Sequence, residues 1–297
     1  MREPDGWRSR AELLLVRSIR DLLGEQLGLL RGSLRAVRSP ANAARETATG
    51  AARVTRALSH SLQAAPASAL NEPLSPLRRL AWTERPLADL RVVKRRYGTS
   101  VNDVVLAAVA GGMRSYLMRR DERPVALKAM VPVSVRGSDD VLGNHLSFVF
   151  AELPCDEPDA LDRLRRVQAT MGARKRDGEP QGADLALRAA QHAPGVVQHA
   201  ISRIVASPRT FNLVVSNIPG PPEPMYMLGC ALEAADPVVP LADRHAVSVG
   251  MTTIGGRACF GVYTDREALP DAGSLAGDID GALSELVELA SAEPAPR

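Results

Sequence analysis

The chain has 297 residues and a formal net charge of +3, and 45% of its residues are hydrophobic. That length and composition fit one large or two modest globular domains with an apolar core. Aromatic residues make up only 3% of the chain, which argues against a stacking surface for single-stranded nucleic acid.

The sequence also indicates a compartment. Its three cysteines lack C-x-x-C spacing and so indicate neither a disulfide framework nor a zinc site. No apolar run is long enough to span a membrane, and the N-terminus lacks the apolar stretch of a secretory signal. We therefore expect a cytoplasmic protein, with peripheral association at the inner face of the membrane as an open alternative.

Positive charge is concentrated at the N-terminal end. Residues 1–60 hold eleven arginines and six acidic residues, giving +5, whereas the remainder holds 26 basic and 28 acidic residues, giving −2. Leucines at helical spacing predict a helix over residues 9–38, and an Ala-rich segment predicts a weaker one over 41–64. Such basic helices can bind a membrane or lipid-droplet surface, and no nucleic-acid motif accompanies them. Alternatively, their leucines pack against the protein's own body and the arginines remain in water.

Prolines mark the next segment, and they predict an extended connector over residues 65–86 with little regular structure. The clearest helix follows, from Tyr97 to Arg120. Ser100 is a suitable N-cap, and Asp103, three residues later, can complete a capping box. Asp103 therefore has a structural interpretation that needs no substrate.

The rest of the chain mixes strands and helices without a regular βα order. Pro132, inside one predicted strand, suggests a sheet edge or a bulge, and Gly255-Gly256 has the pattern of a two-residue hairpin turn. We expect an α+β, or mixed α/β, fold with one principal sheet. The predicted strands cover residues 126–136, 145–153, 210–217, 246–254 and 257–264, and the predicted helices cover 161–175, 183–192, 194–206 and 274–290.

A candidate ligand-binding wall lies at the end of strand 210–217. Its β-branched run closes in Ser216 and Asn217, and Pro219, Gly220 and two further prolines follow. A buried strand that opens into a stiff loop is where folds place polar groups that face a ligand. The alternative is that the serine and the asparagine only initiate the turn.

This stretch resembles the C-terminal region of the bacterial wax ester synthase/diacylglycerol acyltransferase family, and further stretches agree with the family in order. The resemblance extends from Leu70 to the last predicted helix. The stretches that carry it are NEPLS (71–75), VNDVVLA (101–107), AMVPVSVR (129–136), LGN (142–144), FNLVVSNIPGPPEPMYMLG (211–229) and CFGV (259–262).

The resemblance implies the chloramphenicol-acetyltransferase-like fold of CoA-dependent acyltransferases. Residues 65–292 would form its C-terminal domain, residues 1–64 a linker or crossover segment, and residues 293–297 a disordered tail. The implied reaction is acyl transfer from acyl-CoA, as co-substrate, to a long-chain alcohol or diacylglycerol, with no bound cofactor or metal. The implied active-site wall consists of Asn102, Asp103, Ser216, Asn217, Pro219 and Gly220.

The family supplies the base for the alcohol from a two-histidine motif, HHxxxDG. This sequence holds five histidines, and no two of them are adjacent. We therefore expect no catalytic residue in this chain, and we expect an N-terminal half with the motif to supply the base, either from another chain or from a missing N-terminal part of the same gene product. His145 and His245 are weak alternatives, because an isolated histidine is poor evidence for general base catalysis.

A second hypothesis is a non-catalytic lipid- or partner-binding module derived from the family, which would dock on a membrane through residues 9–60. A hydrolase that uses a cysteine or a histidine is a third. No G-x-S-x-G, H-E-x-x-H or P-loop motif supports that third hypothesis.

Overall fold

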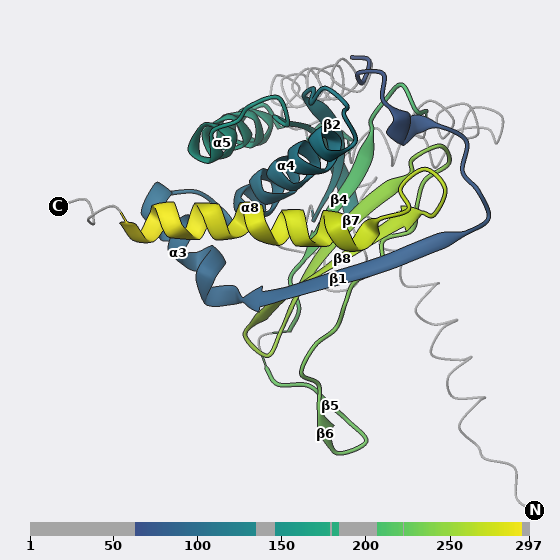
Figure 1. Ribbon diagram of the computed structural model, residues 1–297. Helices are drawn as coiled ribbons and strands as arrows, with labels where there is room; N and C mark the ends of the chain where they lie inside the picture. The colour runs from purple at the N-terminus through teal and green to yellow at the C-terminus, as the bar shows by residue number, and fades with distance from the viewer. Residues whose placement is uncertain (1–62, 135–145, 179, 184–206, 222, 293–297) are drawn as a thin grey trace, which may run out of the picture. The chain divides into compact units, whose positions relative to one another are not determined.

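Within the part of the chain that the structure describes, six strands form the principal sheet, in the order β1-β8-β7-β4-β2-β3 (Figure 1). The central strands β7, β4 and β2 run parallel to one another, whereas β1–β8, β7–β8 and β2–β3 are antiparallel pairs. A mixed sheet of this kind confirms the predicted fold class. The strands are β1 (Arg78–Pro86), β2 (Leu127–Ser134), β3 (Leu146–Leu153), β4 (Leu213–Ile218), β7 (Val247–Ile254) and β8 (Arg257–Asp265).

The helices of the computed structural model pack against this sheet. None of the described helices is long and apolar enough to cross a membrane. They are α3 (Leu87–Tyr97), α4 (Val101–Arg119), α5 (Ala160–Arg176), α8 (Ala272–Ala292) and a short 3-10 helix, η1 (Ala69–Asn71). The structure describes residues 63–134, 146–178, 180–183, 207–221 and 223–292.

Several predictions fall outside these ranges. They are the helices over 9–38, 183–192 and 194–206 and the tail 293–297, apart from residue 183. The predicted segment 1–64 and its helix over 41–64 also lie outside, except for their last two residues. These remain expectations from the sequence.

The core lies between the helices and one face of the sheet. On that face Val215 and Val249 pack with buried side chains of α4, α5 and α8. On the opposite face Phe150, Phe211 and Val214 form a smaller apolar cluster. Because successive strand residues point to opposite faces, the neighbouring valines of β4 belong to different clusters.

The helices α4 and α8 approach each other closely at two adjacent glycines of α4. A Cβ atom on Gly111 would lie 2.7 Å from the Cβ of Ala282. One on Gly112 would lie 2.5 Å from the Cγ1 of Ile279 and 2.8 Å from its backbone nitrogen. The absence of side chains at these glycines therefore allows α8 to cross directly over α4, as Figure 1 shows.

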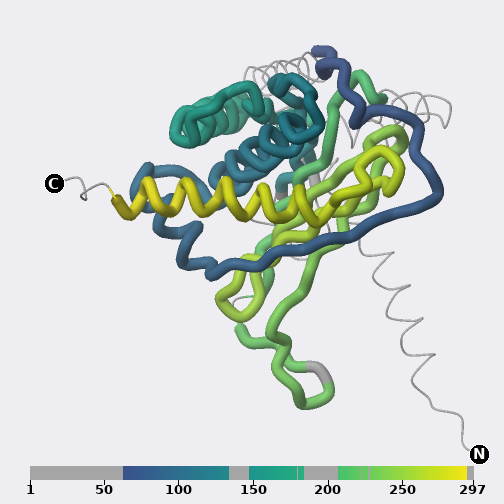
Figure 2. Tube along the Cα trace, viewed as in Figure 1, coloured from purple at the N-terminus to yellow at the C-terminus, as the bar shows by residue number. Residues whose placement is uncertain are grey.

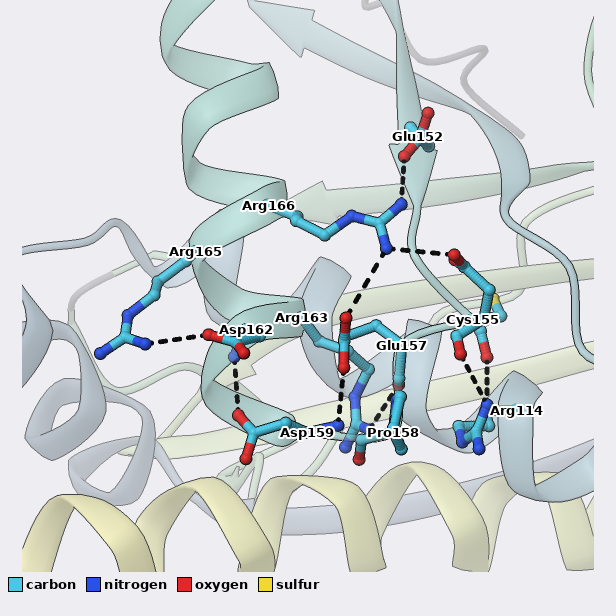
Figure 3. Close-up of polar contacts among 11 residues, drawn as sticks. Arg114, Glu152, Cys155, Glu157, Pro158, Asp159, Asp162, Arg163, Arg165 and Arg166 are labelled. Carbon is cyan, nitrogen blue, oxygen red and sulfur yellow. Dashed lines mark hydrogen bonds and ion pairs between the residues drawn. The ribbon is translucent and has the colours of Figure 1, made fainter.

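Arginines fix the turn that joins β3 to α5 (Figure 3). Arg114 of α4 donates hydrogen bonds to the carbonyl oxygens of Cys155 and Asp156, at 3.1 and 3.0 Å. Arg166 of α5 donates to the carboxylates of Glu152 and Asp156, at 2.8 and 3.1 Å. Because Arg114 satisfies two carbonyl oxygens of the turn and Arg166 pairs with one carboxylate at the end of β3 and one in the turn, α5 begins at a defined position relative to α4.

The prediction of little regular structure over residues 65–86 is wrong in its second half. Residues 78–86 form β1, which pairs with β8 along its whole length, from Arg78↔Asp265 to Pro86↔Arg257. The strand exists because β8 supplies its hydrogen-bond partners, and those partners lie far away in the sequence. Pro86 is tolerated because it is the last residue of an edge strand.

The helix α3 is absent from the predictions, and the predicted helix over 97–120 is shorter at its start. Tyr97 ends α3, and Gly98 follows with φ of 62°, the left-handed conformation of a C-cap glycine. The capping box of α4 is confirmed, with Ser100 and Asp103 bonded reciprocally. The signal for α3 was present as helical spacing of Leu87, Leu90, Val93 and Tyr97 before that glycine.

Pro132 lies in an internal strand without a bulge, but β2 is unpaired there on the side that faces β4. The proline therefore has an edge-like position although its strand is not an edge strand. Its strand β2 lies between β4 and β3 and pairs with β3 without an extra residue, Pro132 opposite Phe148. The pairing of β2 with β4 covers only Ala129 and Met130. The proline therefore lies beyond the part of β2 that pairs with β4. Because no β2–β4 hydrogen bond forms at Pro132, its missing N–H interrupts none.

A short hairpin extends away from the sheet (Figure 2). It consists of β5 (Tyr226–Met227) and β6 (Cys230–Ala231), and Leu228 at its turn is fully exposed.

Asp265, the last residue of β8, joins the connector to the sheet. Its buried carboxylate accepts hydrogen bonds from the backbone and the hydroxyl of Ser75, at 2.7 and 2.9 Å, and from Arg78 at 3.1 Å. The backbone amides of Glu267 and Ala268 donate to its other oxygen, both at 3.0 Å. Burial would raise the pKa of Asp265, but the hydrogen bonds from Ala268, Ser75 and Glu267 outweigh it and lower that pKa.

Replacing Asp265 by asparagine is expected to lower the free energy of unfolding by about 2 kcal/mol at neutral pH, because buried donors lose a charged acceptor. A carboxyl group whose pKa is lowered by folding stabilises the protein above its ordinary value of 3.8, and this contribution disappears as the pH falls through the folded-state pKa. The difference between the wild type and Asp265→Asn should therefore shrink in acid. Urea unfolding at neutral and acidic pH measures it, with the exposed Glu288→Gln as control. If the difference in free energy of unfolding between the wild type and Asp265→Asn did not change with pH, the lowered pKa of Asp265 would be contradicted.

Candidate functional site

A cavity of about 500 Å³ opens where β4 ends. Four parts of the chain surround it: α3, the first residue of α4, the loop after β4, and the end of β7 with its hairpin turn. We name it the Asn217 cavity. Its lining residues are Leu87, Arg91, Lys94, Val101, Asn217, Pro219, Gly220, Pro221, Met251, Thr253, Gly255 and Gly256.

Two threonines of β7 hold the loop after β4. The hydroxyl of Thr252 donates to the carbonyl oxygen of Ile218 at 2.8 Å. The amide of Gly220 donates to the hydroxyl oxygen of Thr253 at 3.0 Å. A Cβ atom on Gly220 would lie 1.8 Å from the carbonyl oxygen of Thr253, so no other residue fits here without moving the loop.

The hairpin turn between β7 and β8 forms another side of the cavity. Gly255 and Gly256 both have positive φ, 54° and 79°, as a primed two-residue turn requires, and this confirms the predicted turn. The carbonyl oxygen of Gly256 accepts a hydrogen bond from the amide of Leu87 at 2.9 Å. This bond fixes the start of α3 against the sheet.

Asn217 presents a polar side chain to the cavity. It is partly buried and pairs in the β4–β7 ladder with Met251, which also lines the cavity. Its carboxamide makes no hydrogen bond to another described residue, so both a donor and an acceptor are available to a ligand. Ser216 is buried, with 5% of its surface exposed, and is not among the residues that line the cavity.

The predicted site residues of α4 lie close to the cavity but do not line it. Val101 lines it, and Asn102 and Asp103 follow. One carboxylate oxygen of Asp103 accepts hydrogen bonds from the hydroxyl of Thr99 at 3.0 Å and from the backbone of Ser100 at 3.0 Å. Asp103 thus fixes the helix start. Of the six predicted site residues, the cavity brings together Asn217, Pro219 and Gly220.

Two asparagines that the sequence analysis did not select position the start of β4. Asn212 is fully buried, and its side chain accepts from the amide of Lys128 at 2.8 Å and donates to Asn71 at 2.7 Å and to Pro66 at 2.9 Å. Asn71 in turn donates to the carbonyl oxygen of Phe211 at 3.1 Å. These bonds tie the connector to the strand that carries Asn217. Both asparagines belong to stretches that carry the family resemblance, and this membership was the one feature of the sequence that could have indicated their role.

The cavity also has a basic side that the sequence analysis missed. Arg91 and Lys94 line it from α3, three residues apart and therefore on one face of the helix. Without a predicted helix over these residues, their common orientation could not be recognised.

His245 is a structural residue. Its side chain is fully buried, with Nδ1 2.6 Å from the carbonyl oxygen of Asp243 and Nε2 3.1 Å from that of Phe211. The ring stacks on Phe211 with the centroids 3.8 Å apart. Burial lowers the pKa of His245 although the carbonyl contacts oppose this effect. Both nitrogens face backbone oxygens, so this imidazole cannot reach a substrate, and His145 lies outside the described residues.

The cysteines offer no activated nucleophile. Burial raises the pKa of the Cys155 thiol to about 12 and also raises that of Cys259. Cys230 is exposed on the hairpin. Among the residues that the structure describes, no group of three or more His, Cys, Asp or Glu is placed to hold a metal ion.

Solved structures define the fold class. The wax ester synthase/diacylglycerol acyltransferase from Marinobacter aquaeolei matches 80% of this chain and 56% of its own, with a TM-score of 0.63 and 29% identity. The epimerization domain from the third module of tyrocidine synthetase B matches 81% of this chain and 56% of its own, with a TM-score of 0.51. At 10% identity that second likeness shows the fold alone. The protein has a chloramphenicol-acetyltransferase-like acyltransferase fold.

Sequence comparisons identify the family within that class. The WS/DGAT C-terminal domain matches residues 142–287, and the wax ester synthase/diacylglycerol acyltransferase catalytic domain matches residues 2–105. The chain belongs to the wax ester synthase/diacylglycerol acyltransferase family. The probable diacylglycerol O-acyltransferase tgs1 of Mycobacterium tuberculosis is 34% identical over 229 residues, 75% of this chain and 50% of that protein. The O-acyltransferase WSD of Acinetobacter baylyi is 34% identical over 209 residues, 69% of this chain and 45% of that protein.

These matches correct one expectation. The chain spans about half the length of the curated relatives it matches. Nevertheless, the family's catalytic domain matches residues 2–105. The expectation that the N-terminal, catalytic half of the family lies wholly outside this chain is therefore wrong. Nothing supports a separate partner chain that supplies that half. The matched residues hold a single histidine, His60, which lies outside the described residues.

Proposed function

We propose that the protein acts in acyl-CoA-dependent O-acyl transfer, with a long-chain alcohol or diacylglycerol as the acceptor and a wax ester or triacylglycerol as the product. The observation that carries this proposal is the Asn217 cavity at the end of β4. Its volume lies within the range of small-molecule sites, and apolar side chains such as Leu87, Val101 and Met251 line it together with one free carboxamide. The names of the matched relatives support the same reaction class.

The chemistry explains why a carboxamide belongs in such a cavity. When an alcohol attacks a thioester, negative charge develops on the carbonyl oxygen, and a fixed N–H donor stabilises it. Asn217 has such a donor on a strand that is hydrogen-bonded to β7. Apolar walls can accept the acyl chain. We propose that Asn217 contacts the reacting thioester, that Pro219 and Gly220 shape the entrance, and that Asp103 supports the wall through the start of α4.

The reaction also needs a base that takes the proton of the alcohol. The described residues supply the binding wall and not this base, since His245 is enclosed and the other four histidines lie outside the described ranges. We further propose that residues 1–64, with their excess of arginine, bring the protein to the membrane or lipid surface in which the acceptors dissolve.

Replacing Asn217 by leucine, which has a similar size and no donor, tests the proposal. We expect the rate of ester formation from palmitoyl-CoA and hexadecanol or dipalmitin to fall about 100-fold, the effect of removing one donor to the developing oxyanion. Product is measured by chromatography and CoA release by thiol titration, with Ser291→Ala at the exposed end of α8 as the control. Ester formation that is indifferent to Asn217→Leu would exclude the proposed contact.

One observation favours a second function. The sequence lacks the family's two-histidine motif, and the described histidine is enclosed, so the protein could bind acyl-CoA without turning it over. In that case the assay shows no ester, whereas an equilibrium titration with palmitoyl-CoA shows saturable binding that Asn217→Leu weakens. Detection of ester with the wild type excludes this alternative.

A further inference from the structure

The basic side of the Asn217 cavity carries positive charge that no acidic side chain of a described residue neutralises. Arg91 and Lys94 are both exposed, and the side chain of neither forms a hydrogen bond or an ion pair with another described residue. They differ in this from Arg85, at the end of β1, which pairs with Asp89 and Asp280. Two unpaired cations on one helix face form a site for an anion.

Among the described residues, no acidic side chain lines the cavity. The nearest carboxylates on α3 and α4 are already engaged: Asp89 pairs with Arg85 at 3.4 Å, and Asp103 accepts the hydrogen bonds of the α4 cap. The described part of the lining therefore contributes two positive charges and no negative ones.

The helix that carries these cations is held firmly. Leu90 and Val93 of α3 are fully buried, and the amide of Leu87 is bonded to the turn between β7 and β8. The opposite wall is the loop after β4, with Asn217 and Gly220. The cavity thus has a charged end on α3 and an uncharged end on β4.

We propose that Arg91 and Lys94 bind the phosphate groups of the CoA portion of the acyl donor, so that α3 forms the CoA end of the cavity and the thioester points toward Asn217. The inference rests on the proposed function. Among the substrates of that function only acyl-CoA carries phosphates, whereas long-chain alcohols and diacylglycerols are neutral. A basic wall therefore distinguishes donor from acceptor and gives the donor a direction.

Binding of three ligands to the purified chain tests this inference. We expect Arg91→Gln/Lys94→Gln to raise the Kd of palmitoyl-CoA by about 10- to 100-fold, as expected for two lost charge-assisted contacts. The Kd of dephospho-palmitoyl-CoA should rise less in the double variant, and the Kd of the uncharged thioester palmitoyl-N-acetylcysteamine should not change. The salt dependence of palmitoyl-CoA binding should also weaken in the double variant.

The matched control is Arg95→Gln/Arg123→Gln, which removes the same charge from exposed positions outside the lining. It should leave all three Kd values unchanged, and both double variants should keep the melting temperature of the wild type. If palmitoyl-CoA binding depends on Asn217 but not on Arg91 and Lys94, the inference is wrong and the proposed function stands. If the wild type binds none of the three ligands, both fail. If the double variant loses only its binding to phosphatidylglycerol vesicles, the cations serve lipid headgroups and the inference is overturned.

Discussion

Replacing Gly112 by alanine is expected to lower the free energy of unfolding by about 3 to 4 kcal/mol. The added Cβ would lie 2.5 Å from the Cγ1 of Ile279 and within 3 Å of its backbone nitrogen and Cα, so α8 itself would have to move. Ordinary overpacking displaces a flexible side chain, but here the obstacle is helix backbone. Urea unfolding followed by circular dichroism measures the change.

Gly281→Ala on α8 is the matched control for this prediction. A Cβ on Gly281 has no atom within 4 Å, so the substitution should raise the free energy of unfolding by about 0.5 to 1 kcal/mol through helix propensity. Equal effects at the two glycines would show that the contact between α4 and α8 does not limit stability.

Replacing Gly220 by alanine is expected to lower ester formation about 100-fold, the cost of displacing a reacting group by about 1 Å. The new Cβ would lie 1.8 Å from the carbonyl oxygen of Thr253, so the loop must leave β7 and take the neighbouring Asn217 side of the cavity with it. Initial rates with palmitoyl-CoA and hexadecanol measure the effect, and the Kd of palmitoyl-CoA measures it if ester is not formed.

Gly273→Ala, in the first turn of α8, adds the same methyl group where no atom lies within 4 Å. It should keep both the rate and the affinity of the wild type. A Gly220→Ala variant that also keeps both would show that the loop after β4 does not form a wall of the site.

The parts of the fold that local sequence determines were predictable. The capping box at Ser100, the glycine turn at Gly255 and the buried strand before Asn217 each depend on residues that are neighbours in the chain. The strand β1 was not predictable in this way, because its partner β8 lies far away in the sequence. The position of Pro132 inside the sheet depends on where β4 stops pairing, which no local pattern encodes.

The residues of the candidate site likewise divide into those that local sequence predicts and those that it does not. Asn217 and Gly220 follow from a strand that ends in a stiff loop, and the cavity lies beside them. Arg91 and Lys94 did not follow, because α3 was not predicted and surface arginines and lysines are common. Ser216 lies next to Asn217 in the sequence yet does not line the cavity, since adjacent strand residues face opposite sides of the sheet.

The pairing of β1 with β8 has a consequence for how this part of the protein is made. Arg85 and Asp280, which bond across β1 and α8, are 195 residues apart. During translation the edge of the sheet and the helix that covers it stay incomplete until α8, which follows β1 by 195 residues at this bond, has left the ribosome. Closing the long loop between β1 and β8 makes assembly slow. Until β8 has paired, the edges of β1 and β7 stay open and can aggregate with other chains.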